Sequence, residues 1–197
     1  MISAVRADAF LERPAAGLDL TTRKAVMRDI PTILALINGY AARGIMLPRT
    51  EFEMSEAIRD FTVVERAGLF LGCGALHFYS PTAGEIRSLA VVENAKTHGA
   101  GRRLVEGLVA EARTYELDAV FAFTYVVEFF SKVGFQVVER GVLPLKAWKD
   151  CLRCPKFHDC DEIAMLRVLR PEHWEQAQPR LWSTGDLYVQ LPTSRRV

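Results

Sequence analysis

The hydrophobic positions between residues 30 and 43 recur every three or four residues, which is the spacing of one face of an α-helix. The members of this apolar face are Ile30, Ile33, Leu34, Ile37 and Tyr40. Asp29 is suited to cap the start of this helix, Pro31 suits its first turn, and Gly44 is suited to end it. The pattern therefore predicts a helix over residues 30–43 that packs one face on a core.

Downstream of this helix the apolar and polar residues alternate, which is typical of strands with one buried face. The end of a second helix is expected over 55–61. The predicted strands cover residues 18–26, 62–65, 69–79 and 85–92. Turns at Ala67-Gly68 and over 80–84 join the last three of them. These segments therefore predict a meander of neighbouring strands.

The second half of the chain predicts a helix that begins near Gly101, followed by a β-rich strand over 119–125. The inward positions of that helix are Leu104, Leu108, Val109 and Ala112. Because a helix connects the strands on either side of it, we expect those two strands to be parallel. A short helix over 127–133 and strands over 135–139 and 162–169 follow. The prediction is an α/β fold with a central mixed sheet flanked by helices.

Length and charge restrict the class of protein. With 197 residues, half of them hydrophobic, the chain is long enough for one domain with a substantial core. We predict that domain over 21–170, between an irregular N-terminal arm over 1–20 and a tail over 171–197. The formal charge of +1 gives no global field for nucleic acid, and no apolar run is long enough to span a bilayer. We expect a cytoplasmic protein with no nucleic-acid or membrane partner.

The segment 96–102 predicts a glycine-containing turn between a strand and a helix. Gly99 and Gly101 lack a Cβ, so the main-chain N–H groups there can converge on a phosphate at the positive end of the helix. The residues of the predicted anion site are Lys96, Thr97, His98, Gly99, Ala100, Gly101 and Arg102. The alternative is a plain helix cap.

The segment 85–105 resembles the acetyl-coenzyme A motif of the GNAT N-acetyltransferases, whose Gln/Arg-x-x-Gly-x-Gly/Ala pattern falls here on Lys96, Gly99 and Gly101. The segment 129–135 is similar to the later helix and Gly-Phe turn of that superfamily. Three further segments, 39–49, 72–77 and 143–157, resemble the short single-domain N-acetylglutamate synthases of bacterial arginine biosynthesis.

The resemblance implies a GNAT fold that binds acetyl-CoA and transfers its acetyl group directly to the α-amino group of L-glutamate. Lysine instead of the family's usual arginine at position 96 keeps the charge but loses the bidentate guanidinium, so weaker coenzyme binding is an alternative. The partner implied is a small-molecule substrate, and a homodimer is an alternative to a monomer. Two rival functions stay open: a GNAT enzyme with another acceptor, and a non-catalytic acyl-CoA-binding module.

The resemblance also suggests the catalytic groups. Many GNAT enzymes use a glutamate near Glu85 to deprotonate the amine through a water, whereas an exposed strand-edge charge is the alternative. The superfamily's usual acid, a tyrosine, is replaced by Phe130, so we expect Tyr125, Ser131 or water to protonate the thiolate. Main-chain amides within Leu89, Ala90 and Val91 would stabilise the oxyanion.

An acceptor with two carboxylates needs fixed cations near the reacting amine. The candidates are Arg49, Arg87, Lys146, Arg153 and Lys156, which match basic positions in the resembling segments. His77 is a further candidate, as a base or as a carboxylate ligand, and a structural histidine is the alternative.

Three cysteines and a histidine fall within ten residues, as Cys151, Cys154, His158 and Cys160. This set could hold zinc, because tetrahedral zinc sites use thiolate and imidazole ligands. We favour the alternative, a packed loop that carries substrate-binding cations, and predict no metal.

Overall fold

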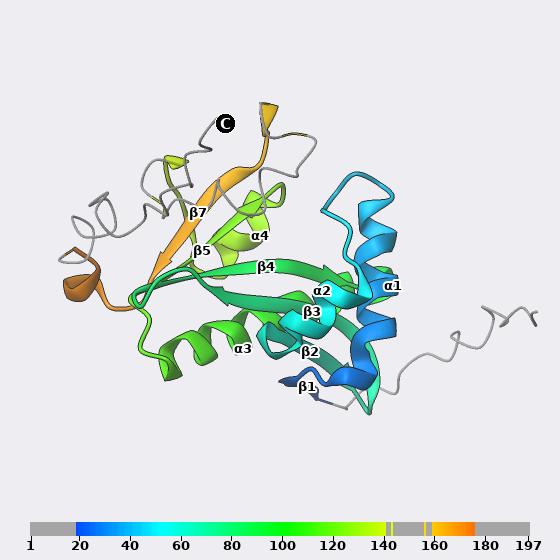
Figure 1. Ribbon diagram of the computed structural model, residues 1–197. Helices are drawn as coiled ribbons and strands as arrows, with labels where there is room; N and C mark the ends of the chain where they lie inside the picture. The colour runs from blue at the N-terminus through cyan, green and yellow to red at the C-terminus, as the bar shows by residue number, and fades with distance from the viewer. Residues whose placement is uncertain (1–18, 141–142, 144–155, 157–158, 176–197) are drawn as a thin grey trace, which may run out of the picture.

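A computed structural model describes residues 19–140, 143, 156 and 159–175 (Figure 1). Its centre is a seven-stranded sheet in the order β1-β2-β3-β4-β5-β7-β6. The strands are β1 Leu20–Lys24, β2 Phe61–Arg66, β3 Leu69–Phe78, β4 Ala83–Val91, β5 Ala119–Thr124, β6 Gln136–Val137 and β7 Ile163–Val168. Every neighbouring pair is antiparallel except β4 and β5, which are parallel.

The helices cover both faces of this sheet. They are α1 Ile30–Ala41, α2 Glu51–Ala57, α3 Ala100–Thr114 and α4 Val127–Lys132, with 3-10 turns η2 Met27–Asp29, η3 Ile58–Asp60 and η4 Glu93–His98. One core joins α1 and α2 to residues such as Val63 and Ala75 on one face. Another joins α3 and α4 to residues such as Ile86 and Val120 on the opposite face. The predicted α/β fold with a mixed, helix-flanked sheet is therefore confirmed.

The predicted periodicities are confirmed for the long elements. Ile33, Ile37 and Tyr40 of α1 are buried, as are the four inward positions predicted for α3. The parallel pairing of β5 with β4 is also confirmed, because Ala83 to Glu85 pair with Ala119 to Phe121.

Several predicted boundaries were wrong. The second helix ends at Ala57, and the turn η3 follows it. Strand β2 already begins at Phe61, because the Phe61 side chain is buried in the core beside α1 and α2. The strand predicted over 135–139 is reduced to Gln136 and Val137. The strand β7 lies between β5 and β6, since Phe121 pairs with Leu166. Long-range pairing of this kind leaves no periodic signature in the local sequence.

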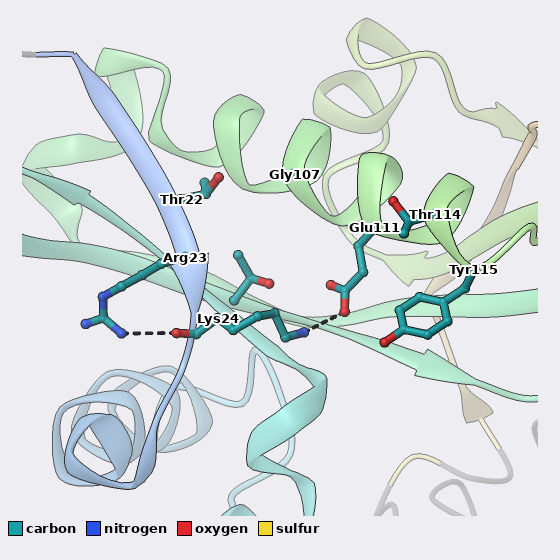
Figure 2. Close-up of a pocket in the computed structure, with 8 residues that line it drawn as sticks. Thr22, Arg23, Lys24, Gly107, Glu111, Thr114 and Tyr115 are labelled. Carbon is teal, nitrogen blue, oxygen red and sulfur yellow. Dashed lines mark hydrogen bonds and ion pairs between the residues drawn. The ribbon is translucent and has the colours of Figure 1, made fainter.

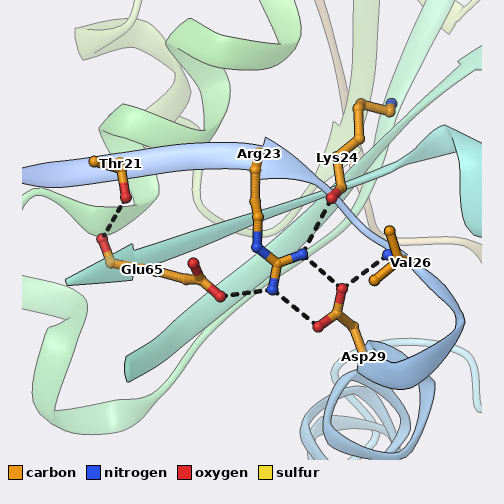
Figure 3. Close-up of polar contacts among 6 residues, drawn as sticks. All are labelled: Thr21, Arg23, Lys24, Val26, Asp29 and Glu65. Carbon is orange, nitrogen blue, oxygen red and sulfur yellow. Dashed lines mark hydrogen bonds and ion pairs between the residues drawn. The ribbon is translucent and has the colours of Figure 1, made fainter. Parts of the chain in front are cut away.

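Edge strand β1 is held by a charged network (Figure 3). The two terminal nitrogens of Arg23, Nη1 and Nη2, donate to the Asp29 carboxylate at 2.7 and 2.9 Å. Nη2 also donates to Glu65 Oε1 at 2.6 Å. Asp29 also accepts from Val26 N at 2.8 Å. The guanidinium holds the pKa of Asp29 below its usual value. The network therefore joins β1 to β2 and to the start of α1.

Residues near the predicted domain ends contribute to the fold. Leu20, at the end of the predicted arm, begins β1. Trp174, in the predicted tail, is 4% exposed and packs in a core with Phe121 and Leu166. Within the part of the chain that the structure describes, no helix is long and apolar enough to cross a membrane.

Candidate active site

The centre of β4 contains a β-bulge. Arg87 is the Cα partner of Ala75 on β3, whereas Ala90 is the partner of Cys73, so β4 contains one extra residue between these pairs. Ser88 lies at the bulge with φ of 52°, a left-handed conformation that residues other than glycine rarely adopt. Such strain at one residue is typical of functional sites, so the bulge marks this part of β4 as a candidate site.

Strands β4 and β5 separate just before the bulge. Their parallel register comprises three pairs and ends at Glu85 and Phe121, although β4 continues to Val91 and β5 to Thr124. Figure 1 shows β5 turning away from β4 in this region. The separation leaves an edge of β4 where an extended ligand chain could pair with the main chain.

The main chain of β4 offers a donor to this opening. The N–H of Val92 donates to Leu71 O of β3 at 2.9 Å. Because alternate residues of a strand direct their main-chain groups to opposite sides, the N–H group of Val91 faces away from β3. The Tyr40 hydroxyl donates to Val91 O at 2.7 Å, as this orientation requires. The opening therefore holds an amide that could stabilise a thioester oxyanion.

The predicted anion-binding turn lies directly after β4. Residues 93–98 form η4, Gly99 adopts φ of 81°, and α3 begins at Ala100, with Arg103 N donating to Gly99 O at 2.9 Å. The amides of Ala100, Gly101 and Arg102 precede this first helical bond, and no side chain caps the helix. The N-terminus of a fifteen-residue helix beside the strand opening can receive a pyrophosphate.

The side chains around this turn fix its shape. A Cβ on Gly101 would lie 3.3 Å from the Phe129 ring, so this glycine lets α4 pack closely against the start of α3. The Lys96 ammonium donates to Glu93 Oε1 at 3.0 Å and lies 5.2 Å from the centre of the Tyr40 ring. Glu93, with help from Tyr40, raises the pKa of Lys96. The positive charge of Lys96 is thus held at the turn, next to Tyr40, whose hydroxyl contacts Val91 O.

Glu85 is buried, with 1% of its surface exposed, so the alternative of an exposed strand-edge charge is wrong. It lies on β4 at the last residue that pairs with β5, two residues before Arg87 and therefore on the same face of the strand. His77 on β3 is its Cα partner. Glu85 is therefore placed where the opening begins.

His77 has a defined partner. Its Nδ1 lies 2.8 Å from Asp60 Oδ2, and its ring contacts the edge of Tyr79 with 5.1 Å between centroids. Asp60 thus orients the imidazole from η3. This arrangement fits a structural histidine. It also fits a base whose Nε2 takes the proton while Asp60 orients the ring through Nδ1.

Arg49 extends to the bulge from the segment before α2. Its Nη2 lies 3.4 Å from Ser88 Oγ, while its main chain bonds to the side chain of Asn38 on α1. The Arg49 guanidinium therefore reaches the stretch of β4 that contains Glu85 and Arg87. Two of the predicted acceptor cations and the predicted base are brought together there.

Tyr125, Lys156 and Asp161 form a separate cluster beyond the end of β5. The Tyr125 hydroxyl donates to Asp161 Oδ1 at 2.8 Å, and Lys156 Nζ donates to both Asp161 oxygens at 3.1 Å and to the Tyr125 hydroxyl at 3.0 Å. Partial burial raises the pKa of Tyr125, so its hydroxyl stays protonated at neutral pH. Lys156 is compensated by Asp161, which makes it a weaker candidate for the acceptor's carboxylates. Ser131 is exposed on α4.

The remaining predicted residues differ in placement. Lys146, Arg153, Cys151, Cys154 and His158 lie outside the described residues. Cys160 is half-buried, while Cys73 is fully buried behind the bulge, with its Sγ 3.9 Å from Ser88 O. Burial raises the pKa of the Cys73 thiol to about 12, so it cannot act as a thiolate nucleophile at neutral pH.

Four polar residues that support this site were not predicted from the sequence. Tyr40 was predicted as an apolar core position and lies in the resembling segment 39–49, whereas Asn38, Asp60 and Ser88 were not singled out. Each acts through a partner distant in sequence, as Tyr40 does through Val91. The resembling segments around Tyr40 and Ser88 were the local signals for these two residues.

A second groove, of about 360 Å³, lies between β1 and α3 (Figure 2). Thr22, Thr62, Glu111 and Tyr115 are among its lining residues, and Lys24 Nζ donates to Glu111 Oε1 at 2.7 Å across it. It shares no residue with the bulge, the turn or the opening between β4 and β5. We therefore treat it as separate from the candidate active site.

Comparison with known proteins gives one family and several relatives. Residues 38–135 match the model of the acetyltransferase (GNAT) family. An uncharacterized N-acetyltransferase from Chlorobaculum tepidum is 42% identical over 156 residues, which are 79% of this chain and 99% of that protein. The amino-acid acetyltransferase of Mycobacterium tuberculosis is 38% identical over 120 residues, 59% of this chain and 68% of that protein.

A solved structure shares both the fold and substantial sequence identity. It is the N-acetylglutamate synthase from Neisseria gonorrhoeae complexed with coenzyme A and N-acetyl-glutamate, with a TM-score of 0.70 and 31% identity. The similarity covers 78% of this chain but 36% of that one, so this chain spans about a third of the Neisseria protein.

Proposed function

Because the chain belongs to the GNAT family of acetyltransferases, we propose that it transfers the acetyl group of acetyl-CoA to the α-amino group of L-glutamate. At a coarser level, the chain is an acetyl-CoA-dependent N-acetyltransferase that acts on an amino acid. The choice of glutamate, and the roles of individual residues, are the proposed part.

The observation that carries the proposal is that the Arg49 guanidinium reaches β4 at Ser88, which follows Arg87 directly and lies three residues after Glu85. A buried carboxylate next to the strand opening is suited to accept a proton from the incoming ammonium. Two guanidinium groups beside it are suited to bind the carboxylates of an amino acid, because arginine binds carboxylates in bidentate fashion. Glutamate has two carboxylates and therefore uses both. The Neisseria synthase bound to N-acetyl-glutamate supports the same acceptor.

We propose that the acetyl donor lies along the edge of β4, with its pyrophosphate at the N-terminus of α3. The amides of Ala100, Gly101 and Arg102 and the nearby Lys96 would contact the phosphates. The N–H of Leu89 or Val91 would contact the thioester carbonyl oxygen, where negative charge develops. Lys96 would then exchange part of its bond to Glu93 for a phosphate oxygen.

The transfer itself is direct. Glu85, through a water, accepts a proton from the α-ammonium, and the free amine attacks the thioester carbon. The C–N bond forms, and the carbonyl electrons shift to the oxygen held by the β4 amide. The C–S bond then breaks as the carbonyl re-forms, the thiolate takes a proton from the acid, and the attacking nitrogen loses its second proton, which restores that acid. The buried, protonated Cys73 makes an acyl-enzyme through that thiol untenable.

We assign protonation of the leaving thiolate to Tyr125, with Ser131 or water as the alternatives. The Tyr125 hydroxyl carries its proton at neutral pH and lies at the carboxyl end of β5, next to the opening. Because a coenzyme A thiolate is a stable leaving group, the loss of this acid should cost less than the loss of the base.

The proposal extends to the setting of the reaction. We infer that N-acetylglutamate formed here enters arginine biosynthesis in the cytoplasm, as the resemblance of the chain implies.

An acceptor screen tests the proposal. The purified chain is incubated with acetyl-CoA and each amino acid in turn, and released coenzyme A is measured with a thiol reagent. We expect L-glutamate to give the fastest release. If coenzyme A is released faster with another amino acid, that amino acid is the acceptor and the glutamate proposal is wrong. If no amino acid gives release although coenzyme binding is measurable, the non-catalytic module is favoured.

A further inference from the structure

We propose that Asn38 is a positioning residue that holds Arg49 at the acceptor side of the β4 bulge. The inference rests on the proposed role of Arg49 in binding a carboxylate of the amino-acid acceptor. It concerns a residue on α1 that lies eleven positions before Arg49 in the sequence.

The end of α1 determines where the chain goes next. Ile45 N donates to Tyr40 O at 3.2 Å, and Gly44 N donates to Ala41 O at 2.9 Å, with Gly44 at φ of 70°. This pair of bonds is a Schellman motif, which stops the helix and reverses the chain. Residues after Gly44 therefore run back beside the last turns of α1.

The side chain of Asn38 attaches the returning segment to α1. Its Nδ2 donates to Arg49 O at 3.0 Å, and its Oδ1 accepts from Arg49 N at 2.9 Å. One side-chain amide thus satisfies both main-chain groups of Arg49. A carboxamide is required for this, because it offers a donor and an acceptor side by side, whereas aspartate offers acceptors alone.

The residue after Arg49 is fixed independently. Thr50 caps α2: its Oγ1 accepts from Glu53 N at 3.2 Å, and Thr50 N donates to Glu53 Oε2 at 2.8 Å. Arg49 is thus held between the Asn38 amide and this capping box. Its Cα is fixed from both sides, so the side-chain torsions alone determine where the guanidinium lies.

The guanidinium reaches the bulge from this fixed origin, with Nη2 3.4 Å from Ser88 Oγ. Without Asn38, the segment before α2 would keep the Schellman motif and the cap but lose its attachment to α1 at Arg49. The guanidinium would then sample positions away from the acceptor. Recognition of the amino-acid acceptor should weaken, while the binding of acetyl-CoA at the N-terminus of α3 should not.

A double-mutant cycle on the whole chain tests this inference, with the amino acid that the wild type turns over fastest as acceptor. Because Asn38→Ala removes both hydrogen bonds to the main chain of Arg49, it should lower kcat/KM for the amino-acid acceptor by roughly tenfold. The loss should lie mainly in the acceptor KM, with the KM for acetyl-CoA changed less than about twofold. In an Arg49→Gln background, Asn38→Ala should lower kcat/KM for the amino-acid acceptor less than about twofold, because Asn38 acts by positioning Arg49.

Two further variants separate positioning from stability. Ser55→Ala removes a side-chain bond to Glu51 O within α2 without touching Arg49, and should leave the acceptor KM unchanged. Asn38→Asp is nearly isosteric. It keeps the hydrogen-bond acceptor for Arg49 N but loses the hydrogen-bond donor to Arg49 O. This variant should weaken binding of the amino-acid substrate even if Asn38→Ala does not fold.

The outcomes are distinguishable. Equal losses from Asn38→Ala in both backgrounds, or a matching rise in the KM for acetyl-CoA, would overturn the positioning role. Unchanged acceptor kinetics in Arg49→Gln would overturn it together with the assignment of Arg49. A wild type that prefers an acceptor other than glutamate would instead contradict the proposed acceptor, and the cycle would still decide the role of Asn38.

Discussion

At the scale of single residues, burial gives Glu85 its proposed chemistry. Its carboxylate lies inside the sheet at the point where β4 and β5 begin to separate, and is 1% exposed. From the sequence, a base and a surface charge were equally consistent with this residue. Its burial excludes an exposed surface charge, and we propose Glu85 as the base beside the opening between the strands.

Replacing Glu85 with glutamine keeps the shape of the side chain and removes the proton acceptor. Glu85→Gln should therefore lower kcat by roughly 10² with the fold intact. The defect should shrink as the pH rises, because more of the acceptor is then present as free amine. Steady-state rates across pH measure this, with Glu106→Gln on the exposed face of α3 as the control.

A wild-type rate in Glu85→Gln at neutral pH would move the base to His77 or to solvent. Asp60→Asn would then separate these two, because it removes the carboxylate that orients the imidazole.

At the scale of elements, the junction between β4, the turn and α3 was predicted well from the sequence. The glycines at 99 and 101 indicated the start of a helix, and Gly99 is left-handed where α3 begins. That both glycines let the main chain approach a phosphate stays a prediction, and the structure adds a packing role for one of them. Gly101 lies against the Phe129 ring, a contact between α3 and α4 that no local pattern reveals.

A larger side chain at Gly101 should therefore disturb the phosphate site from the α4 side. Gly101→Val should raise the KM for acetyl-CoA by at least about tenfold, since displacing Phe129 shifts the first turn of α3 and its charge-assisted contacts. Gly107→Ala is the control: its Cβ would be similarly close to Thr22, at 3.2 Å, but on the far groove. Calorimetric coenzyme affinity equal to the wild type in a folded Gly101→Val protein would contradict the anion site.

The attachment of β1 makes stability dependent on pH in a defined direction. Asp29 has a lowered pKa because Arg23 donates to it, so its contribution is present above its unfolded pKa of about 3.9 and is lost as the pH falls through the folded value. Asp29→Asn should cost about 1 to 2 kcal/mol of unfolding free energy at pH 7. The difference from wild type should shrink below about pH 4.

Urea titrations at pH 7 and pH 3 measure this difference. Glu111→Gln breaks the more exposed pair that the adjacent Lys24 makes, and should cost less than about 0.5 kcal/mol. If the difference in unfolding free energy between the Asp29→Asn variant and the wild type stays constant with pH, the effect belongs to packing and not to the ion pair.

At the scale of the whole molecule, the sequence was sufficient for features carried by neighbouring residues. The helical face of α1, the meander from β2 to β4 and the turn before α3 each leave a local period or a motif. The insertion of β7 between β5 and β6 leaves none, and neither do contacts that join distant elements, such as Tyr40 with Val91 or Asn38 with Arg49. The predicted cations on either side of the bulge could be listed from sequence, but which of them converge could not.

The same long-range contacts position the residues that we propose to bind the acceptor. The pairing of β4 with β5 ends at Glu85, and the opening beyond it lies between the cations near Glu85 at one end and the N-terminus of α3 at the other. A single strand therefore connects the proposed donor site to the proposed acceptor site.

The comparison of glutamate with glutamine tests the central proposal most directly. The two acceptors share the α-carboxylate, but glutamine lacks the side-chain charge that the second cation would bind. Since a charge-assisted contact is worth roughly 1.5 to 3 kcal/mol, kcat/KM of the wild type should favour glutamate by about tenfold to a few hundredfold. Comparable kcat/KM values for the two amino acids would contradict the proposed glutamate specificity.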